Sequence, residues 1–92
     1  MTTKAAASDI AALTRWSLDA AGKSLHRQLK FADFNEAWGF MNRVALLAES
    51  QNHHPDWSNV WNTVDITLST HDAGGLTDKD LTLARAIDAI AP

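Results

Sequence analysis

Apolar and polar residues follow two different periods along this chain. Residues 16–19 alternate at the two-residue period of a half-buried strand, and residues 25–31 repeat that pattern. Residues 20–23 lie between them as a turn, in which Gly22 can take a positive φ. These segments predict a first hairpin. A second pair of strands is expected over residues 57–70, where apolar and polar side chains alternate again.

A helical period of three to four residues follows the first hairpin. Asp33 and Glu36 form a capping-box pattern that opens the longest helix. We expect this helix to end around Gln51, because Pro55 lacks an N–H donor and biases His54 away from helical geometry. Its apolar stripe is expected to face the core and comprises Phe34, Ala37, Trp38, Met41, Val44, Ala45, Leu47 and Ala48.

Two shorter helices are expected near the ends of the chain. Ser8 or Asp9 would cap the first, which runs to Leu13. Thr77 and Asp80 form a capping box for the last. The apolar face of this closing helix is formed by Leu81, Ala84, Ile87 and Ile90.

The order of elements is α-β-β-α-β-β-α and indicates an α+β protein. Sequential strand pairs favour a two-layer sandwich, with a four-stranded antiparallel sheet and three helices on one face. Residues 1–92 would form a single domain, with residues 1–7 expected to be flexible. Such a sandwich leaves the other sheet face and a sheet edge for a partner subunit, so we expect a homo-oligomer.

Composition narrows the class of function. Eight basic and eleven acidic residues give a net charge of −3 without a basic run, which argues against nucleic acid as a ligand. The chain has no cysteine, which excludes disulfides and thiolate ligands and weakly favours a reducing compartment. No apolar run is long enough to cross a membrane, and the N-terminus has no signal-peptide pattern. We therefore expect a cytoplasmic protein.

Three of the four histidines lie between positions 53 and 71, and they are the first candidates for chemistry. His53 and His54 precede Pro55 at the end of the long helix, and His71 follows a strand on its polar side. Imidazole can donate and accept protons near neutral pH. A pocket between the strand end and the His-His-Pro loop would suit proton transfer.

Structural readings remain open for the same residues. His53 and His54 could bind carbonyl groups at a helix C-terminus, His71 could close a turn, and Asp80 is explained by its capping box. Glu49, in the last turn of the long helix, is unfavourable there for an anion and hints at a role.

Two further alternatives concern the tryptophans and a metal. Trp57 and Trp61 are expected to be packing residues, although an aromatic ring beside a histidine cluster could also stack on a flat ligand. Three histidines and a carboxylate could bind zinc, but adjacent histidines differ from the spacing of common zinc sites. We therefore expect no metal and no cofactor.

The spacing of these residues resembles the signature of the pterin-4a-carbinolamine dehydratases. The matching positions are Glu49, His53, His54, Pro55, Trp61, His71 and Asp80. Residues 57–62, 66–71 and 34–48 are also similar to that family, whereas the first dozen residues carry little of its pattern. The resemblance implies a four-stranded antiparallel sheet backed by helices, assembled as a homodimer or homotetramer.

The resemblance also implies an activity. Such enzymes dehydrate a 4a-hydroxytetrahydropterin, 4a-hydroxytetrahydrobiopterin, to a quinonoid dihydropterin, and so recycle the pterin cofactor of aromatic amino acid hydroxylases. The reaction needs a general acid at the C4a oxygen and a general base at N5, tasks that imidazole can perform without a metal.

By the same resemblance, the catalytic residues are His53, His54, His71 and Asp80. As a hypothesis, His53 and His71 transfer protons, His54 positions the pterin, and Asp80 orients His71. The substrate-binding residues would be Glu49, His54, Trp57 and Thr70, with Trp57 as a wall of the pocket. Some animal members also act as dimerisation cofactors of a transcription factor. A non-catalytic oligomeric binding module is therefore the alternative, and a metal-dependent hydrolase is a third possibility.

Overall fold

A computed structural model describes residues 2–92 of the chain. Its elements follow the predicted order α-β-β-α-β-β-α, with one additional 3-10 turn before the last helix. They are α1 (Ala7–Ala11), β1 (Ser17–Leu18), β2 (Leu25–Lys30), α2 (Phe34–Gln51), β3 (Asp56–Val60), β4 (Thr63–Leu68), the 3-10 turn η1 (His71–Ala73) and α3 (Asp78–Ile90).

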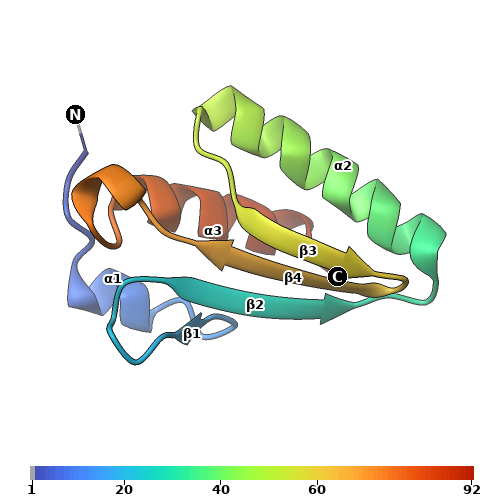
Figure 1. Cartoon of the computed structure of the whole chain (residues 1–92), viewed down its shortest axis with the longest axis horizontal. Helices are drawn as coiled ribbons and strands as arrows, with labels where there is room; N and C mark the ends of the chain where they lie inside the picture. The colour runs from blue at the N-terminus through green and yellow to red at the C-terminus, as the bar shows by residue number, and fades with distance from the viewer. Residues whose placement is uncertain (1) are drawn as a thin grey trace.

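The four strands form one antiparallel sheet in the order β1-β2-β4-β3 (Figure 1). Strand β4 therefore lies inside the sheet, where Ile66 is opposite Arg27 of β2 and Trp57 of β3. The alternating pattern of β4 is confirmed, since Val64 and Leu68 are buried with Ile66. The predicted α+β class and its antiparallel sheet are confirmed.

The helices cover one face of the sheet, and the opposite face is polar. Phe40 and Val44 of α2 and Leu83 of α3 are fully buried in the core that these helices form with β4. On the open face, Asp65 of β4 accepts hydrogen bonds from the Gln28 amide and pairs with the His26 ring, both at 3.1 Å. The layer arrangement thus leaves one sheet face available to solvent.

Helix α2 has the predicted ends but buries a different face. The Asp33 side chain accepts from the Glu36 amide and caps the helix, which ends at Gln51 as expected. The predicted core stripe is wrong in part. The Phe34 and Trp38 side chains are 46% and 52% exposed, and Ala45 is also exposed, whereas Phe40 is buried outside that stripe. The core selects a strip of α2 about a quarter turn away from these three residues.

Two other predictions about local structure need correction. Helix α1 is capped at Ala6, without a side-chain cap, so Ser8 and Asp9 lie inside the helix. Tertiary contacts of Ile10 and Leu13 with the core hold this short helix instead. Trp61, expected to pack, is 62% exposed because it lies in the β3–β4 turn with a φ of 49°.

The N-terminal segment lies against the start of α3. The Ala5 amide donates to the Leu76 carbonyl, and the Asp78 amide donates to the Thr3 carbonyl. Thr3 and Ala5, within the segment for which the sequence predicts flexibility, thus have backbone partners in residues 76–78, and Met1 lies outside the described residues.

Asp88, near the C-terminal end of α3, joins this helix to the sheet. Its carboxylate accepts from the Trp16 indole at 2.9 Å and from the Arg27 guanidinium at 2.5 Å. Because Trp16 and Arg27 belong to different segments, this one carboxylate connects α3 to the N-terminal region and to β2.

Among the described residues, no helix has both the length and the apolar character of a membrane span.

Candidate active site

The end of helix α2 directs the two adjacent histidines. Asn52 takes a left-handed conformation with a φ of 51°, and its amide donates to the Glu49 carbonyl. The His53 amide then donates to the Ala48 carbonyl at 3.1 Å. A left-handed residue that ends a helix in this way reverses the chain direction. His53 and His54 consequently leave the helix end toward different partners.

His53 points inward and contacts Asp80 of α3. Its Nε2 lies 2.6 Å from Asp80 Oδ1. The His53 side chain is 11% exposed and that of Asp80 is fully buried. This distance is typical of a short charge-assisted hydrogen bond. The sequence hypothesis assigns Asp80 to His71, whereas the hydrogen bond found in residues 2–92 joins Asp80 to His53.

Asp80 is itself fixed by two threonines. Its Oδ2 accepts from the Thr70 hydroxyl at 2.7 Å and from the Thr77 amide at 2.9 Å. The two threonine hydroxyls are 2.8 Å apart. The predicted capping box of Thr77 and Asp80 is confirmed. A buried carboxylate is tolerated when each oxygen has a hydrogen-bond partner. Both oxygens of Asp80 have one, so its side chain is held in one orientation.

His54 lies on the surface with Glu49. Its Nε2 is 2.9 Å from Glu49 Oε1, but the two side chains are 58% and 79% exposed. Such an exposed pair contributes little to stability, about 0–1 kcal/mol. Both side chains therefore remain accessible to a ligand.

His71 begins the 3-10 turn η1 and is exposed. It borders a cavity of about 280 Å³ that is also lined by Ser69, Thr70 and Lys23. Within residues 2–92, no hydrogen bond joins His71 to the other two site histidines. It is connected to His53 indirectly, since Thr70 precedes it in the chain and binds the carboxylate that binds His53.

The remaining predicted site residues differ in accessibility. Trp57 is partly buried against the core, on the helix-covered side of the sheet. Thr70 is buried, and its hydroxyl contacts Asp80 and Thr77. It therefore holds the Asp80 carboxylate rather than facing solvent.

A smaller cavity lies beside His53. It has a volume of about 240 Å³ and is also lined by Gln51, Asp78 and Thr82. The Gln51 side-chain oxygen is buried, and no hydrogen-bond partner for it is found in the part of the chain that the structure describes. Gln51 was missed by sequence reasoning, which treated it only as a helix end.

The role of Thr77 was foreseen only in part. Its capping pattern is visible in the sequence, but its contact with Thr70 is not.

No group of three or more histidine, cysteine or acidic side chains arranged to bind a metal ion is found in residues 2–92. His53 and His54 instead pair with separate carboxylates, those of Asp80 and Glu49.

Comparison with known proteins gives a consistent result. The model of the family described as pterin 4 alpha carbinolamine dehydratase matches residues 1–90. A Burkholderia orbicola protein is 60% identical over 79 residues, which cover 86% of this chain and 78% of that protein. A Paraburkholderia xenovorans protein is 51% identical over 90 residues, which cover 98% and 94% of the two chains. Both are named, provisionally, pterin-4-alpha-carbinolamine dehydratases.

Solved structures agree with the sequence relatives. A Brucella melitensis protein described as a transcriptional coactivator/pterin dehydratase is 39% identical, with a TM-score of 0.89 over 98% of this chain and all of that chain. A pterin dehydratase-like protein described as a RuBisCO assembly factor in the alpha-carboxysome is 24% identical, with a TM-score of 0.61 over 72% and 76% of the two chains. The second likeness concerns the fold alone. The chain belongs to the pterin-4-alpha-carbinolamine dehydratase family.

Proposed function

We propose that this protein dehydrates 4a-hydroxytetrahydrobiopterin to quinonoid dihydrobiopterin and water, and so recycles the pterin cofactor of aromatic amino acid hydroxylases. The family and the names of the relatives support a pterin dehydratase. The observation that carries the proposal is the His53–Asp80 pair, in which an imidazole with little exposure meets a fully buried carboxylate at 2.6 Å.

The proposed reaction needs two proton transfers. The C4a–O bond breaks as the oxygen takes a proton from a general acid and leaves as water. A general base removes the proton from N5, and the electron pair of the N–H bond forms the C4a=N5 double bond. Imidazole can serve in both steps, and such catalysis typically contributes about 10²- to 10⁴-fold.

We assign the proton transfers to His53 and His71. Asp80 holds His53 through Nε2, which leaves Nδ1 as the nitrogen that exchanges a proton with the substrate. In this assignment Asp80 is a positioning residue, because it acts through His53. His71 is exposed beside its cavity and meets the substrate from a second side.

Substrate binding is proposed for the exposed residues around these two histidines. His54 and Glu49 form an accessible pair that can bind polar edges of the pterin ring. Trp57 of β3 would form a wall against the pterin ring. Thr70 would not contact the pterin and would act by holding the Asp80 carboxylate.

The test is the rate of dehydration of synthetic 4a-hydroxytetrahydrobiopterin with and without the protein. We expect His53→Ala and His71→Ala each to lower kcat by about 10²-fold or more, within the range of general acid–base catalysis. His26→Ala is the matched control, because this fourth histidine lies on the open sheet face with Asp65. Wild-type rates in both site variants would refute the assignment.

We also propose that the protein is a homo-oligomer. Phe34 and Trp38 of α2 stack on each other at a centroid distance of 6.0 Å while about half of each side chain is exposed. A paired aromatic surface of this kind is typical of protein interfaces. A homodimer or homotetramer formed through this surface would cover both rings.

A further inference from the structure

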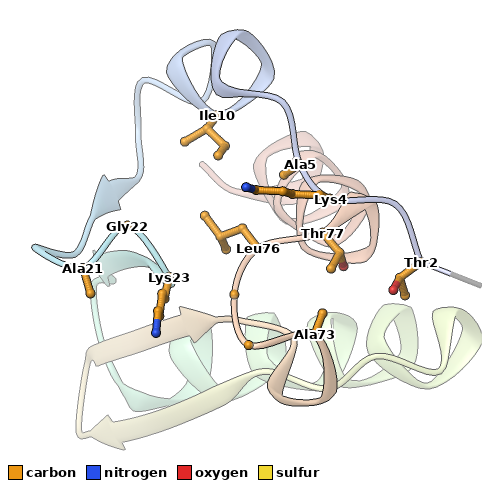
Figure 2. A pocket seen from close by; sticks show the side chains of 12 residues that line it. Thr2, Lys4, Ala5, Ile10, Ala21, Gly22, Lys23, Ala73, Leu76 and Thr77 are labelled. Atoms are coloured by element: carbon orange, nitrogen blue, oxygen red, sulfur yellow. The ribbon is translucent and has the colours of Figure 1, made fainter.

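A third cavity borders the candidate active site and has a distinct charge. It has a volume of about 530 Å³, within the range of small-molecule sites. Lys4 reaches it from the N-terminal segment and Lys23 from the β1–β2 turn, on the far side of Leu76 (Figure 2). None of the residues that line it is acidic. The cavity is thus cationic in a chain with a net charge of −3.

Within residues 2–92, no carboxylate forms an ion pair with either ammonium group. The ion pairs found among residues 2–92 involve histidine or arginine as the cation, and none includes Lys4 or Lys23. Both lysines are exposed. Two cations without carboxylate partners in a concave site raise the local concentration of anions.

Lys23 and the Gly74–Gly75 loop connect this cavity to His71. All three of these residues also line the cavity that contains His71 and Thr70. A Cβ atom placed on Gly75 would lie 3.8 Å from Cγ of Lys23, so the lysine stem lies against the loop that follows His71. A molecule held by His71 can therefore extend over this loop toward both lysines.

The backbone around the cavity is held in place by the site itself. Thr77 lines the cavity, and its amide donates to the Asp80 carboxylate that binds His53. Lys4 is opposite Thr77 in an antiparallel bridge, and the neighbouring Ala5 amide donates to the Leu76 carbonyl. Occupation of the cavity and the position of Asp80 therefore both depend on the segment that contains Leu76 and Thr77.

We infer that the cavity between Lys4 and Lys23 binds the side chain of the pterin substrate, and that it favours a side chain ending in an anion, a phosphate monoester or a carboxylate. This inference rests on the dehydratase function proposed above. The ring would be held at His71 and His53, and the acidic group would pair with the two ammonium groups. The reaction at C4a and N5 is unchanged, since the side chain only binds.

The test compares two 4a-hydroxytetrahydropterins that differ only in their side chain, one neutral and one phosphorylated. The wild-type ratio of kcat/KM, phosphorylated over neutral, should exceed one and should fall as salt is raised. It should drop about fivefold in the Lys4→Gln/Lys23→Gln double variant, the effect expected for two exposed ion pairs. Lys30→Gln, which removes one positive charge at the end of β2, should leave the ratio unchanged, and each single variant, Lys4→Gln or Lys23→Gln, should lower it. A carboxylated side chain provides a second arm that separates phosphate from carboxylate preference.

Failure of the inference is distinguishable from failure of the proposed function. Equal kcat/KM values for the two pterins, or a ratio unaffected by the double variant, would overturn the inference while dehydration continued. If no pterin were dehydrated, equilibrium binding of the oxidised, unreactive pterin pair would decide. Tighter binding of the phosphorylated form that depended on Lys4 and Lys23 would support the site, and equal binding would refute it. Inorganic phosphate that bound as tightly as the phosphorylated pterin would also refute the assignment to substrate.

Discussion

At the scale of single residues, the site depends on how one buried carboxylate is satisfied. Asp80 is fully buried, which is costly for a charge without partners. Its oxygens bind the His53 ring, the Thr70 hydroxyl and the Thr77 amide. His53 and Thr70 contact different oxygens of the one carboxylate, so a change in Thr70 should be transmitted to His53.

Thr70→Val tests this transmission. Valine keeps the shape of the side chain but removes the donor to Asp80 Oδ2, so one buried acceptor loses a partner. We expect the free energy of unfolding to fall by about 1–3 kcal/mol. We also expect kcat to fall with little change in KM, because the imidazole is positioned less well and the pterin contacts remain.

Thr63→Val is the matched control for that variant. Its hydroxyl donates to the Asn62 side chain at the start of β4, away from the candidate site. Denaturant unfolding and steady-state kinetics of the two variants give the comparison. Equal kcat values in Thr70→Val and the wild type would show that Asp80 keeps His53 in place without this hydroxyl.

At the scale of elements, the β1–β2 turn presents Lys23 to the cavity. The Asp19 carboxylate accepts from the Lys23 amide at 2.7 Å and from the Ser24 amide at 3.2 Å. The Asp19 amide donates in turn to the Ser24 carbonyl, and Gly22 takes a φ of 70°. The conformation of this turn therefore depends on one ionised side chain.

These contacts make the turn sensitive to pH. The hydrogen bond from the Lys23 amide, assisted by that from Ser24, lowers the pKa of Asp19 below its ordinary value of 3.8. A carboxyl group whose pKa is lowered in the folded state stabilises the protein above the unfolded-state value. This contribution is fully present above pH 3.8 and is lost as the pH falls through the lower, folded-state pKa.

Asp19→Asn should remove that pH dependence. The difference in unfolding free energy between wild type and variant should be constant near neutral pH and shrink as the pH falls below 3.8. Urea unfolding at a series of pH values measures it. Asp33→Asn serves as the control, because it makes the same substitution at the N-cap of α2, outside the β1–β2 turn. A difference that grew on acidification would contradict the expected sign.

At the scale of the whole molecule, the exposed apolar residues gather on different sides of a small protein. The helix-covered face of the sheet is filled by the core, and the open face is polar around His26 and Asp65. Phe34 and Trp38 extend the apolar surface of α2 beyond the core. Val60 lies at the edge strand β3, 76% exposed. The aromatic pair on α2 is the more extensive surface for a second subunit.

Trp38→Glu should therefore lower the mass of the assembly in solution. The side chain is 52% exposed in the monomer, so the substitution leaves the core intact. We expect sedimentation to show an oligomer for the wild type and a smaller species for the variant. Val60→Glu, at the sheet edge, should keep the wild-type mass. The reverse result would place the interface at the edge of the sheet.

Much of the fold could be predicted because the relevant patterns are local. The alternation of Val64, Ile66 and Leu68 defines β4, and the Thr77-to-Asp80 capping box defines the start of α3. Each pattern is contained in a few consecutive residues. The buried face of α2 could not be read in the same way, since Trp38 and Phe40 are both apolar and only packing against the sheet distinguishes them.

The sequence by itself determined the order of the elements, the antiparallel pairing and the family signature from Glu49 to Asp80. Only the tertiary structure decided that Asp80 binds His53, which lies 27 positions away in the chain. The same holds for the cationic cavity, because Lys4 and Lys23 line it from opposite sides of Leu76 only when the N-terminal segment pairs with the start of α3. Hydrophobic periodicity reports which side of an element is buried, whereas contacts between distant polar groups depend on how the packed elements are placed.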